Sequence, residues 1–345
     1  MNRRADLVGS RPLVDAFGRR VTDLRVSITD RCNLRCTYCM PEEGMQWLPR
    51  TALLTYEEQA RIVRVCVERY GFESVRVTGG EPLARAHVAR LVAMLAPLGV
   101  DIAMTTNGVM LADAAQDLVA AGLRRINVSL DTLDPEAFQR LTKRDDLARV
   151  LRGIDAALDA GLAPVKINCV VMRGVNDHEI TDLAAFGREK GVGIRFIEFM
   201  PLDAQGAWTP ESVVGASEIL ERIHAVFPLA DRPVQGGSSH DHVDPAERFR
   251  YADGIGDVGV IASVTAPFCE RCDRIRVTAE GSLRSCLFAL DEYDLRTILR
   301  DAPDEHVDDL LAAEIERAVD AKWAGHRIGR VDFVRPARSM SQIGG

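Results

Sequence analysis

Strand and helix patterns alternate along the first 200 residues, and this alternation limits the fold to one built on a parallel sheet. The strand segments are short, apolar and rich in β-branched residues, and helical periodicity fills the gaps between them. We expect strands at Leu24–Thr29, Ser74–Thr78, Val100–Thr106, Arg125–Leu130, Pro164–Met172 and Gly193–Met200, and helices at Tyr56–Tyr70, Ala84–Leu98, Leu111–Ala121, Leu147–Ala160 and Asp177–Lys190. Right-handed crossovers between such strands predict an α/β fold, a partial TIM-like (βα)6 barrel, with a doubly wound sheet as the alternative.

One face of these strands is polar, although a covered parallel sheet is normally apolar on both faces. Side chains alternate along a strand, so Arg25, Arg76 and Lys166 fall on the face opposite the branched apolar residues. Unpaired buried cations cost several kcal/mol each, on the order of a lost ion pair. The pattern therefore predicts a polar lumen that holds an anionic ligand; the alternative is structural pairing of these cations with Asp131 and Glu198.

Three cysteines follow the first expected strand, at Cys32, Cys36 and Cys39. A structural zinc site needs four protein ligands, and this loop supplies three. A cubane iron–sulfur cluster takes up to four thiolates, so three would leave one iron free for a ligand that is not protein. We favour the cluster over a zinc knuckle completed from elsewhere in the chain.

The second expected strand ends in Gly79-Gly80-Glu81-Pro82. Two glycines allow close backbone approach or a positive φ, and proline suits the first turn of a following helix. The segment lies where the ends of parallel strands place active sites, beside the loop that carries the cysteines.

A second incomplete set is formed by Cys269, Cys272 and Cys286. His240 and His242 could complete a zinc site, but they lie in a polar loop, and we favour a second cluster with an open iron. Arg274 and Arg276 alternate on a probable strand and so project to one face, suited to bidentate phosphate recognition.

The pattern changes after Met200, which suggests a second unit. We expect an N-terminal arm at 1–20, the partial barrel at 21–204, and a smaller C-terminal α+β domain at 205–345 that carries the second cluster. Residues 231–257 are rich in Gly, Ser, Asp and Pro and predict a long loop.

Composition narrows the functional classes. The formal net charge of −8 argues against nucleic-acid or membrane binding through a basic surface, and no apolar run suits a membrane span or a signal peptide. A cytoplasmic location is therefore expected, where cysteines serve metal binding or catalysis rather than disulfides.

The first triad and the Gly79–Pro82 segment together resemble the radical S-adenosylmethionine superfamily. That resemblance implies a four-iron, four-sulfur cluster on Cys32, Cys36 and Cys39, whose open iron binds S-adenosylmethionine. It also implies contacts from Gly79, Gly80 and Glu81 to the methionine amine, and from Tyr38 on the adenine side.

The two triads, the paired arginines and the terminal Gly344-Gly345 resemble more closely the GTP 3′,8-cyclase family of molybdenum-cofactor biosynthesis. This resemblance implies two 4Fe-4S clusters and S-adenosylmethionine as cofactors. The implied GTP contacts are Arg25, Arg76, Thr105, Lys166, Arg274, Ile275 and Arg276, and the implied S-adenosylmethionine contacts include Tyr38, Gly80, Ser129 and Met200. Arg25, Arg274, Arg276, Gly344 and Gly345 would be catalytic, with the glycine tail inside the cavity.

The same resemblance implies the reaction and its partners. A 5′-deoxyadenosyl radical takes hydrogen from ribose C3′ of GTP, and the carbon radical attacks guanine C8. Reduction by one electron and protonation then give 3′,8-cyclo-7,8-dihydro-GTP, which passes to cyclic pyranopterin monophosphate synthase. A flavodoxin or ferredoxin would supply electrons, and the chain could act as a homodimer. The alternatives are a radical enzyme that modifies peptides and an iron–sulfur electron carrier without catalytic activity.

Overall fold

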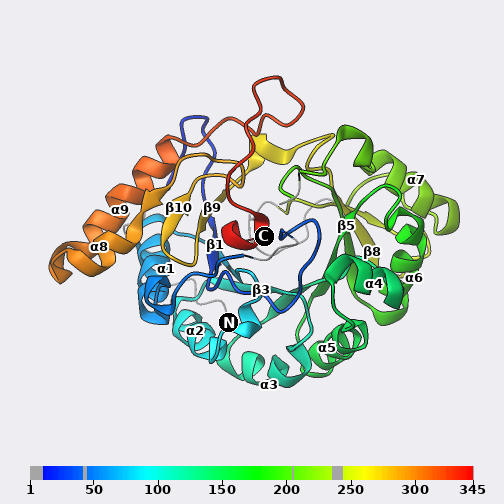
Figure 1. Cartoon of the computed structure of the whole chain (residues 1–345), viewed down its shortest axis with the longest axis horizontal. Helices are drawn as coiled ribbons and strands as arrows, with labels where there is room; N and C mark the ends of the chain where they lie inside the picture. Colours follow the sequence, from blue (N-terminus) through cyan, green and yellow to red (C-terminus); the bar gives the residue numbers. More distant parts are fainter. Residues whose placement is uncertain (1–10, 42–44, 204–205, 235–243, 345) are drawn as a thin grey trace.

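A single curved sheet organises the computed structural model, which describes residues 11–41, 45–203, 206–234 and 244–344. Its strand order is β11-β10-β9-β1-β2-β3-β4-β5-β6-β8-β7, and the sheet curls into an open barrel (Figure 1). The strands are β1 Asp23–Ser27, β2 Ser74–Thr78, β3 Asp101–Thr106, β4 Arg125–Ser129, β5 Val165–Val171, β6 Gly193–Glu198, β7 Glu247–Arg250, β8 Asp257–Ile261, β9 Arg274–Val277, β10 Ser282–Arg284 and β11 Tyr293–Asp294.

Helices cover the outer side of this barrel (Figure 1). They are α1 Tyr56–Tyr70, α2 Val88–Leu95, α3 Leu111–Ala121, α4 Pro135–Thr142, α5 Leu147–Asp159, α6 Ile180–Lys190, α7 Ala216–Val226, α8 Leu295–Asp301, α9 Asp304–Asp320 and α10 Met340–Ile343. The short α10 lies at the centre of the ring, where the tail of the chain ends in the view of Figure 1.

Local sequence explains where the helices begin and end, as α1 illustrates. Thr55 and Glu58 form a capping box, in which Glu58 N donates to Thr55 Oγ1 at 3.1 Å and Thr55 N donates to the Glu58 carboxylate at 2.6 Å. Gly71 ends the helix with a φ of 67°, which glycine adopts at no steric cost.

The core lies between the sheet and these helices. Leu24, Val26 and Ile28 point outward from β1 and its extension, and each is at most 2% exposed. Val75 and Val77 continue the same layer on β2. The branched face of each strand therefore belongs to the core, and the polar face is left for the interior of the barrel.

The expected parallel sheet is confirmed, with every pair from β1 to β6 parallel and in sequential order. Strands beyond residue 204 join the same sheet, with β9 parallel to β1 at one edge and β8 parallel to β6 at the other. The C-terminal part thus extends the barrel at both edges, while the domain boundaries at 20/21 and 204/205 remain predictions.

Three local predictions were wrong. The helix expected at Ala84–Leu98 is α2 alone between two 3₁₀ turns, because His87 has a φ of 62° and Pro97 falls in the second turn. Helix α4 was missed, although Asp134 caps it by accepting from Ala137 N at 2.6 Å. The loop expected over 231–257 contains β7, a charged edge strand without an alternating apolar pattern. His240 and His242 lie outside the described residues.

Candidate functional site

The loop that carries the first triad rests on the end of α4. Arg35 N donates to Thr142 O and Thr37 N donates to Leu141 O, both at 2.9 Å. The Arg35 guanidinium turns back to donate to Cys32 O at 2.6 Å. Unsatisfied carbonyls at a helix end thereby fix the loop backbone between the first and third cysteines.

The three thiols of this loop are free and partly buried neighbours. Burial, with Glu81 nearby, raises the pKa of Cys32 to about 11, and burial together with Cys32 raises the pKa of Cys39 to about 12. Burial and the neighbouring Cys39 also raise the pKa of Cys36. Among the described residues, no three His, Cys, Asp or Glu side chains converge as ligands of one ion. A cluster instead takes each thiolate on a different iron, and three neighbouring thiols on one loop fit that ligand set.

The Gly79-Gly80-Glu81 segment packs directly on the cysteine loop. Gly80 N donates to Thr29 O at 2.7 Å and Glu81 N donates to Arg31 O at 2.8 Å. A Cβ on Gly80 would overlap the carbonyls of Asp30 and Arg31, so only glycine fits this close approach.

Glu81 forms a structural link from this segment to β3. Its buried carboxylate accepts from Thr106 Oγ1 at 2.7 Å and from Asn107 N at 2.6 Å, and burial raises its pKa to about 6. Asn107 Nδ2 lies 3.6 Å from Cys32 Sγ. Sequence reasoning missed Asn107; the run Thr105-Thr106-Asn107-Gly108 at the end of an expected strand was the available signal.

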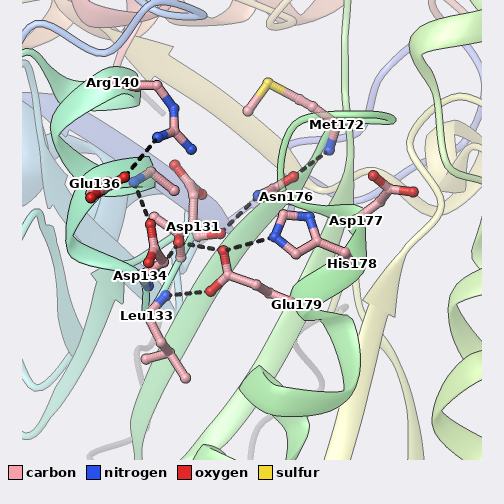
Figure 2. Close-up of polar contacts among 12 residues, drawn as sticks. Asp131, Leu133, Asp134, Glu136, Arg140, Met172, Asn176, Asp177, His178 and Glu179 are labelled. Atoms are coloured by element: carbon pink, nitrogen blue, oxygen red, sulfur yellow. Dashed lines mark hydrogen bonds and ion pairs between the residues drawn. The ribbon is translucent and has the colours of Figure 1, made fainter.

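Tyr38 is fixed by a carboxylate at the end of β4. Its hydroxyl donates to Asp131 Oδ2 at 2.6 Å, while Asp131 Oδ1 accepts from Val170 N at 2.9 Å. Figure 2 shows the polar network around this position, in which Asn176 Nδ2 donates to Asp131 O at 2.8 Å and Glu179 accepts from Leu133 N at 2.7 Å. The network joins the segments that follow β4 and β5, and Asp131 connects it to Tyr38.

Ser129 and Met200 also lie at the carboxyl end of the parallel strands. Ser129 is the last residue of β4, opposite Asn168 of β5, and Met200 follows the end of β6. Both are partly buried. Tyr38, Gly79, Gly80, Ser129 and Met200 therefore all lie at or just beyond the carboxyl ends of their strands.

A row of arginines crosses the interior of the barrel. Arg25 of β1 pairs in register with Arg76 of β2 on one side and with Arg276 of β9 on the other. Burial, with like charges nearby, lowers the pKa of Arg25 and of Arg276 to about 9 and that of Arg76 to about 10. The Nε atoms of Arg25 and Arg76 are buried without a hydrogen-bond partner among the described residues. Such a set is suited to a multiply charged anion.

Further polar groups continue the row across β3 to β6. Thr105 and Lys166 both pair in register with Asn127 of β4. Lys166 Nζ lies 3.7 Å from Asp244, which also pairs with Arg195. Burial and Arg195 lower the pKa of Lys166 to about 8. Sequence reasoning missed the buried Arg195, although the strand parity that identified Lys166 also applies to it.

Among the described residues, neither Asp131 nor Glu198 forms the structural ion pairs of the alternative. Glu198 instead accepts from Ala216 N at 2.8 Å, Val264 N at 2.7 Å and Thr265 N at 2.8 Å. Asp131 is engaged with Tyr38 and Val170 as described above. Both carboxylates hold backbone, so neither neutralises the arginine row.

The second triad lies at the amino ends of the parallel strands, opposite the end that carries the first triad. Cys269 and Cys272 lie on a 3₁₀ turn at Phe268–Arg271 and its cap, directly before β9 begins, and Cys286 follows the antiparallel β10. Gly325 approaches this turn closely, since a Cβ there would lie 3.1 Å from Cys269 Cβ. Burial acts to raise the pKa of Cys272, but Lys322 and Arg274 nearby lower it overall.

Arg274 and Arg276 share the interior face of β9, whereas Ile275 does not. Arg274 Nε lies 3.5 Å from Asp23 Oδ2 at the start of β1. Ile275 pairs in register with Leu24 of the outer face and is fully buried. Only the main chain of Ile275 can therefore border the interior.

The C-terminal tail enters the barrel and contacts both the arginine row and the loop of the first triad. Arg276 Nη1 donates to Gly344 O at 2.5 Å, and Ser27 Oγ donates to Ile343 O at 3.3 Å. Ser341 lies beside Cys39, where hydrogen bonds to the thiol act to lower the pKa that burial raises. Gly344 has a φ of 85°, and a Cβ there would overlap Ser27 Oγ. Gly345 lies outside the described residues.

A cavity of about 560 Å³ opens beside this tail. It is lined by Met45 and Gln46, which follow the first triad, by Leu202 after β6, and by Arg335 and Gln342 of the tail. The tail thus forms one wall of an opening at the end of the parallel strands that carries the first triad. No described helix is long and apolar enough to cross a membrane.

Comparison with family models defines the class of protein. Residues 26–187 match the radical SAM superfamily, and residues 192–328 match the family described as Molybdenum Cofactor Synthesis C. A solved structure of SuiB from Streptococcus suis bound to the precursor peptide SuiA has a TM-score of 0.58 and 14% identity, and the match covers 87% of this chain and 67% of that one. At this identity the likeness concerns the fold alone.

Similar curated proteins narrow the class to one family. A GTP 3′,8-cyclase of Streptomyces coelicolor is 50% identical over 100% of both chains, and one of Mycolicibacterium smegmatis is 49% identical over 97% of this chain and 92% of its own. A third, from Rhodopirellula baltica, is 45% identical over 96% of this chain and 92% of its own. The chain belongs to the GTP 3′,8-cyclase family.

Proposed function

We propose that this protein is a radical S-adenosylmethionine enzyme that converts GTP to 3′,8-cyclo-7,8-dihydro-GTP, the first step of molybdenum-cofactor biosynthesis. The observation that carries the proposal is the arrangement of two three-cysteine sets at opposite ends of the parallel strands of one sheet, with the arginine row between them. Neither a peptide substrate nor an electron carrier requires that row of buried cations.

Cys32, Cys36 and Cys39 would hold the first 4Fe-4S cluster, with S-adenosylmethionine on its open iron. When bound, this pair supplies a 5′-deoxyadenosyl radical that takes the hydrogen atom from ribose C3′ of GTP. Gly79 and Gly80 bring backbone close to the methionine end. Asp131 holds the hydroxyl of Tyr38, so that this ring can border the adenine from a fixed position.

Cys269, Cys272 and Cys286 would hold the second cluster, and its open iron would bind the guanine of GTP. The triphosphate is then placed along Arg25, Arg76, Lys166 and Thr105. Arg25 and Arg76 can turn unpartnered Nε groups to phosphate oxygens without breaking an existing bond at that atom. Charge-assisted, bidentate contacts of this kind also fix orientation.

The interior residues would determine which C–H bond reacts by holding GTP in one orientation. A substrate held at both ends presents C3′ toward the first site while its guanine C8 stays within reach of the same ribose. The tail closes the space, with Gly344 beside Arg276 and Ser341 beside Cys39. Excluding water and oxygen is essential, because a primary alkyl radical abstracts hydrogen from almost any neighbour.

The cyclised product would pass to cyclic pyranopterin monophosphate synthase, the next enzyme of molybdenum-cofactor biosynthesis. A low-potential reductant protein, such as a flavodoxin or a ferredoxin, would supply electrons to the first cluster. A homodimer is compatible with this scheme, and nothing in it depends on one.

The proposal is tested by anaerobic reconstitution of three proteins: the parent, a variant with the first triad changed to alanine, and a variant with the second triad changed to alanine. We expect about eight iron per chain in the parent and about four in each variant, since each triad holds one four-iron cluster. With S-adenosylmethionine, dithionite and GTP, only the parent should form the cyclised product. Equal product from the second variant would contradict the proposal, and about four iron plus one zinc in the parent would revive the structural-zinc alternative.

A further inference from the structure

Lys322 joins the two chain segments that carry the second triad. It follows the end of α9, is only 3% exposed, and its Nζ donates to Arg274 O at 2.6 Å and to Ser285 O at 2.8 Å. Its Nζ also lies 3.6 Å from Cys272 Sγ. Because Arg274 follows the Cys269–Cys272 turn and Ser285 precedes Cys286, one ammonium group spans both parts of the cysteine set.

The charge of this buried lysine is not balanced by a carboxylate. Among the ion pairs of the described residues none includes Lys322. The carboxylates of Asp23 and Asp273 lie 3.5 and 3.7 Å from the Nε of Arg274 instead. Two carbonyl oxygens solvate the ammonium but do not neutralise it. A buried cation without an anion is unfavourable, so negatively charged thiolates at the second triad would stabilise Lys322.

The first triad has different electrostatic surroundings, although Arg35 also lies near Cys32 and Asp273 near Cys272. Glu81 and Asp131 are buried beside Cys32 and Cys36, and both carboxylates act to raise the pKa values of those thiols. No lysine donates to a cysteine of the first triad among the described residues. The two incomplete sites are therefore built differently, one against carboxylates and one against a buried ammonium.

We propose that Lys322 is a positioning residue for the second iron–sulfur cluster. It fixes the spacing between Cys272 and Cys286 through the two carbonyls, and its ammonium balances the negative charge of the thiolates. A nearby positive charge favours the reduced form of a cluster, so Lys322 raises the reduction potential of the second cluster. This inference rests on the proposed function, which places a cluster at this triad.

The test uses full-length protein in which Cys32, Cys36 and Cys39 are changed to alanine, so that the iron signal comes from the second site alone. Lys322→Met removes the charge and keeps the length of the side chain, and Lys322→Arg keeps the charge. Lys190→Met, which removes a partly exposed lysine paired with Asp155 at 2.7 Å, is the matched control. An EPR-monitored redox titration and the rate of iron loss to a chelator are measured for each.

We expect Lys322→Met to shift the potential of the second cluster to more negative values and to lose iron about 10-fold faster, as is typical when an outer partner of a metal ligand is removed. Lys322→Arg should shift the potential less, and Lys190→Met should match the parent. An unchanged potential in Lys322→Met would overturn the inference.

Thermal unfolding separates this role from a purely structural one. Without the cluster, Lys322→Met loses two hydrogen bonds but also removes an uncompensated buried charge, so its melting temperature should lie close to that of its parent. With the cluster loaded, the same variant should be less stable than its parent. Equal destabilisation in both states would mean that Lys322 only cross-links two carbonyls, and would refute the inference. Absence of iron from the parent in this background would overturn both the inference and the proposed second cluster.

Discussion

Some buried cations of the interior are paired with carboxylates and others are not, so we expect them to contribute unequally to anion binding. Arg195 and Lys166 share Asp244, and Arg274 lies near Asp23. Arg25 and Arg76 retain unpartnered Nε atoms among the described residues. An incoming triphosphate would gain most from Arg25 and Arg76, and would compete with Asp244 for Lys166.

The pH dependence of GTP affinity should reveal Lys166. Burial lowers its pKa from 10.5 to about 8, so its charge is complete well below that pH and is lost as the pH rises through it. Because the triphosphate favours the charged form, binding near pH 8 should take up a proton. Calorimetry in two buffers of different ionisation enthalpy measures that uptake. We expect GTP affinity to fall above pH 8 in the parent.

Two variants at this position sharpen the pH test. Lys166→Met should weaken GTP binding about 10-fold at neutral pH, consistent with the loss of one charge-assisted contact, and should show no fall near pH 8. Lys166→Arg should remain charged throughout. If Lys166→Met keeps the same pH profile as the parent, another group is responsible.

Gly344 is the position of the tail at which a side chain is least tolerable. Its φ of 85° and its approach to Ser27 leave no room for a Cβ, and conformations reserved for glycine cost other residues roughly 1–3 kcal/mol. Gly344→Ala should therefore lower cyclisation roughly 5- to 150-fold, since about 1.4 kcal/mol corresponds to a factor of ten. Iron content and the melting temperature should stay at parent values, because the tail lies outside the core. Full activity after removal of both terminal glycines would contradict this role.

At the scale of elements, the Gly79–Glu81 segment and the cysteine loop act as one unit. Gly80→Ala would push the backbone of this segment away from Asp30 and Arg31. We expect the iron content to fall from about eight to about four per chain, with loss of S-adenosylmethionine binding and retention of the second cluster. Gly215→Ala, where the nearest atom would be an ordinary 3.5 Å away, is the matched control. Normal iron content in Gly80→Ala would show that the two loops are independent.

Much of the element pattern could be predicted from the sequence because the signals were local. The bounds of β2, α1 and α3 were predicted to the residue, since each has clear periodicity and an end signal. Helix α4 was missed because it is only 8 residues long, and its start signal, Asp134 followed by Pro135, was not used. Strand β7 was missed because an exposed edge strand carries no apolar alternation.

At the scale of the whole molecule, the two cysteine sets lie at opposite ends of the parallel strands. β9 joins β1 in parallel, so the turn before β9 lies at the amino end of β1 and the first triad at its carboxyl end. The polar face that predicted an anion site could be read from strand parity alone. The register of Arg76, Arg25 and Arg276 could not, because it depends on pairing between strands far apart in the sequence.

Arg19, which precedes β1, joins that part of the chain to the C-terminal region. Arg19 pairs with Asp15 at 2.5 Å and donates to Cys269 O at 2.7 Å and to Ala324 O at 2.8 Å. Sequence reasoning had no signal for these contacts, since they join residues some 250 to 305 positions apart.

Arg19→Ala should therefore destabilise the protein by about 3–5 kcal/mol, the range for breaking a buried ion pair by removing one partner. Thermal unfolding measures this, and the second cluster should lose iron before the first. Arg11→Ala, which removes an exposed pair with Glu316, is the matched control and should be near neutral. A melting temperature unchanged by Arg19→Ala would show that these contacts of Arg19 do not stabilise the fold.

The central claim is that one radical reaction links the two cysteine sites through GTP held between them. Its most direct measurement uses GTP labelled with deuterium at C3′, incubated anaerobically with the reconstituted protein, S-adenosylmethionine and dithionite. We expect mass spectrometry to detect deuterium in 5′-deoxyadenosine, together with a product in which C3′ is joined to C8. Unlabelled 5′-deoxyadenosine, or none at all under conditions where both clusters are present, would contradict the account.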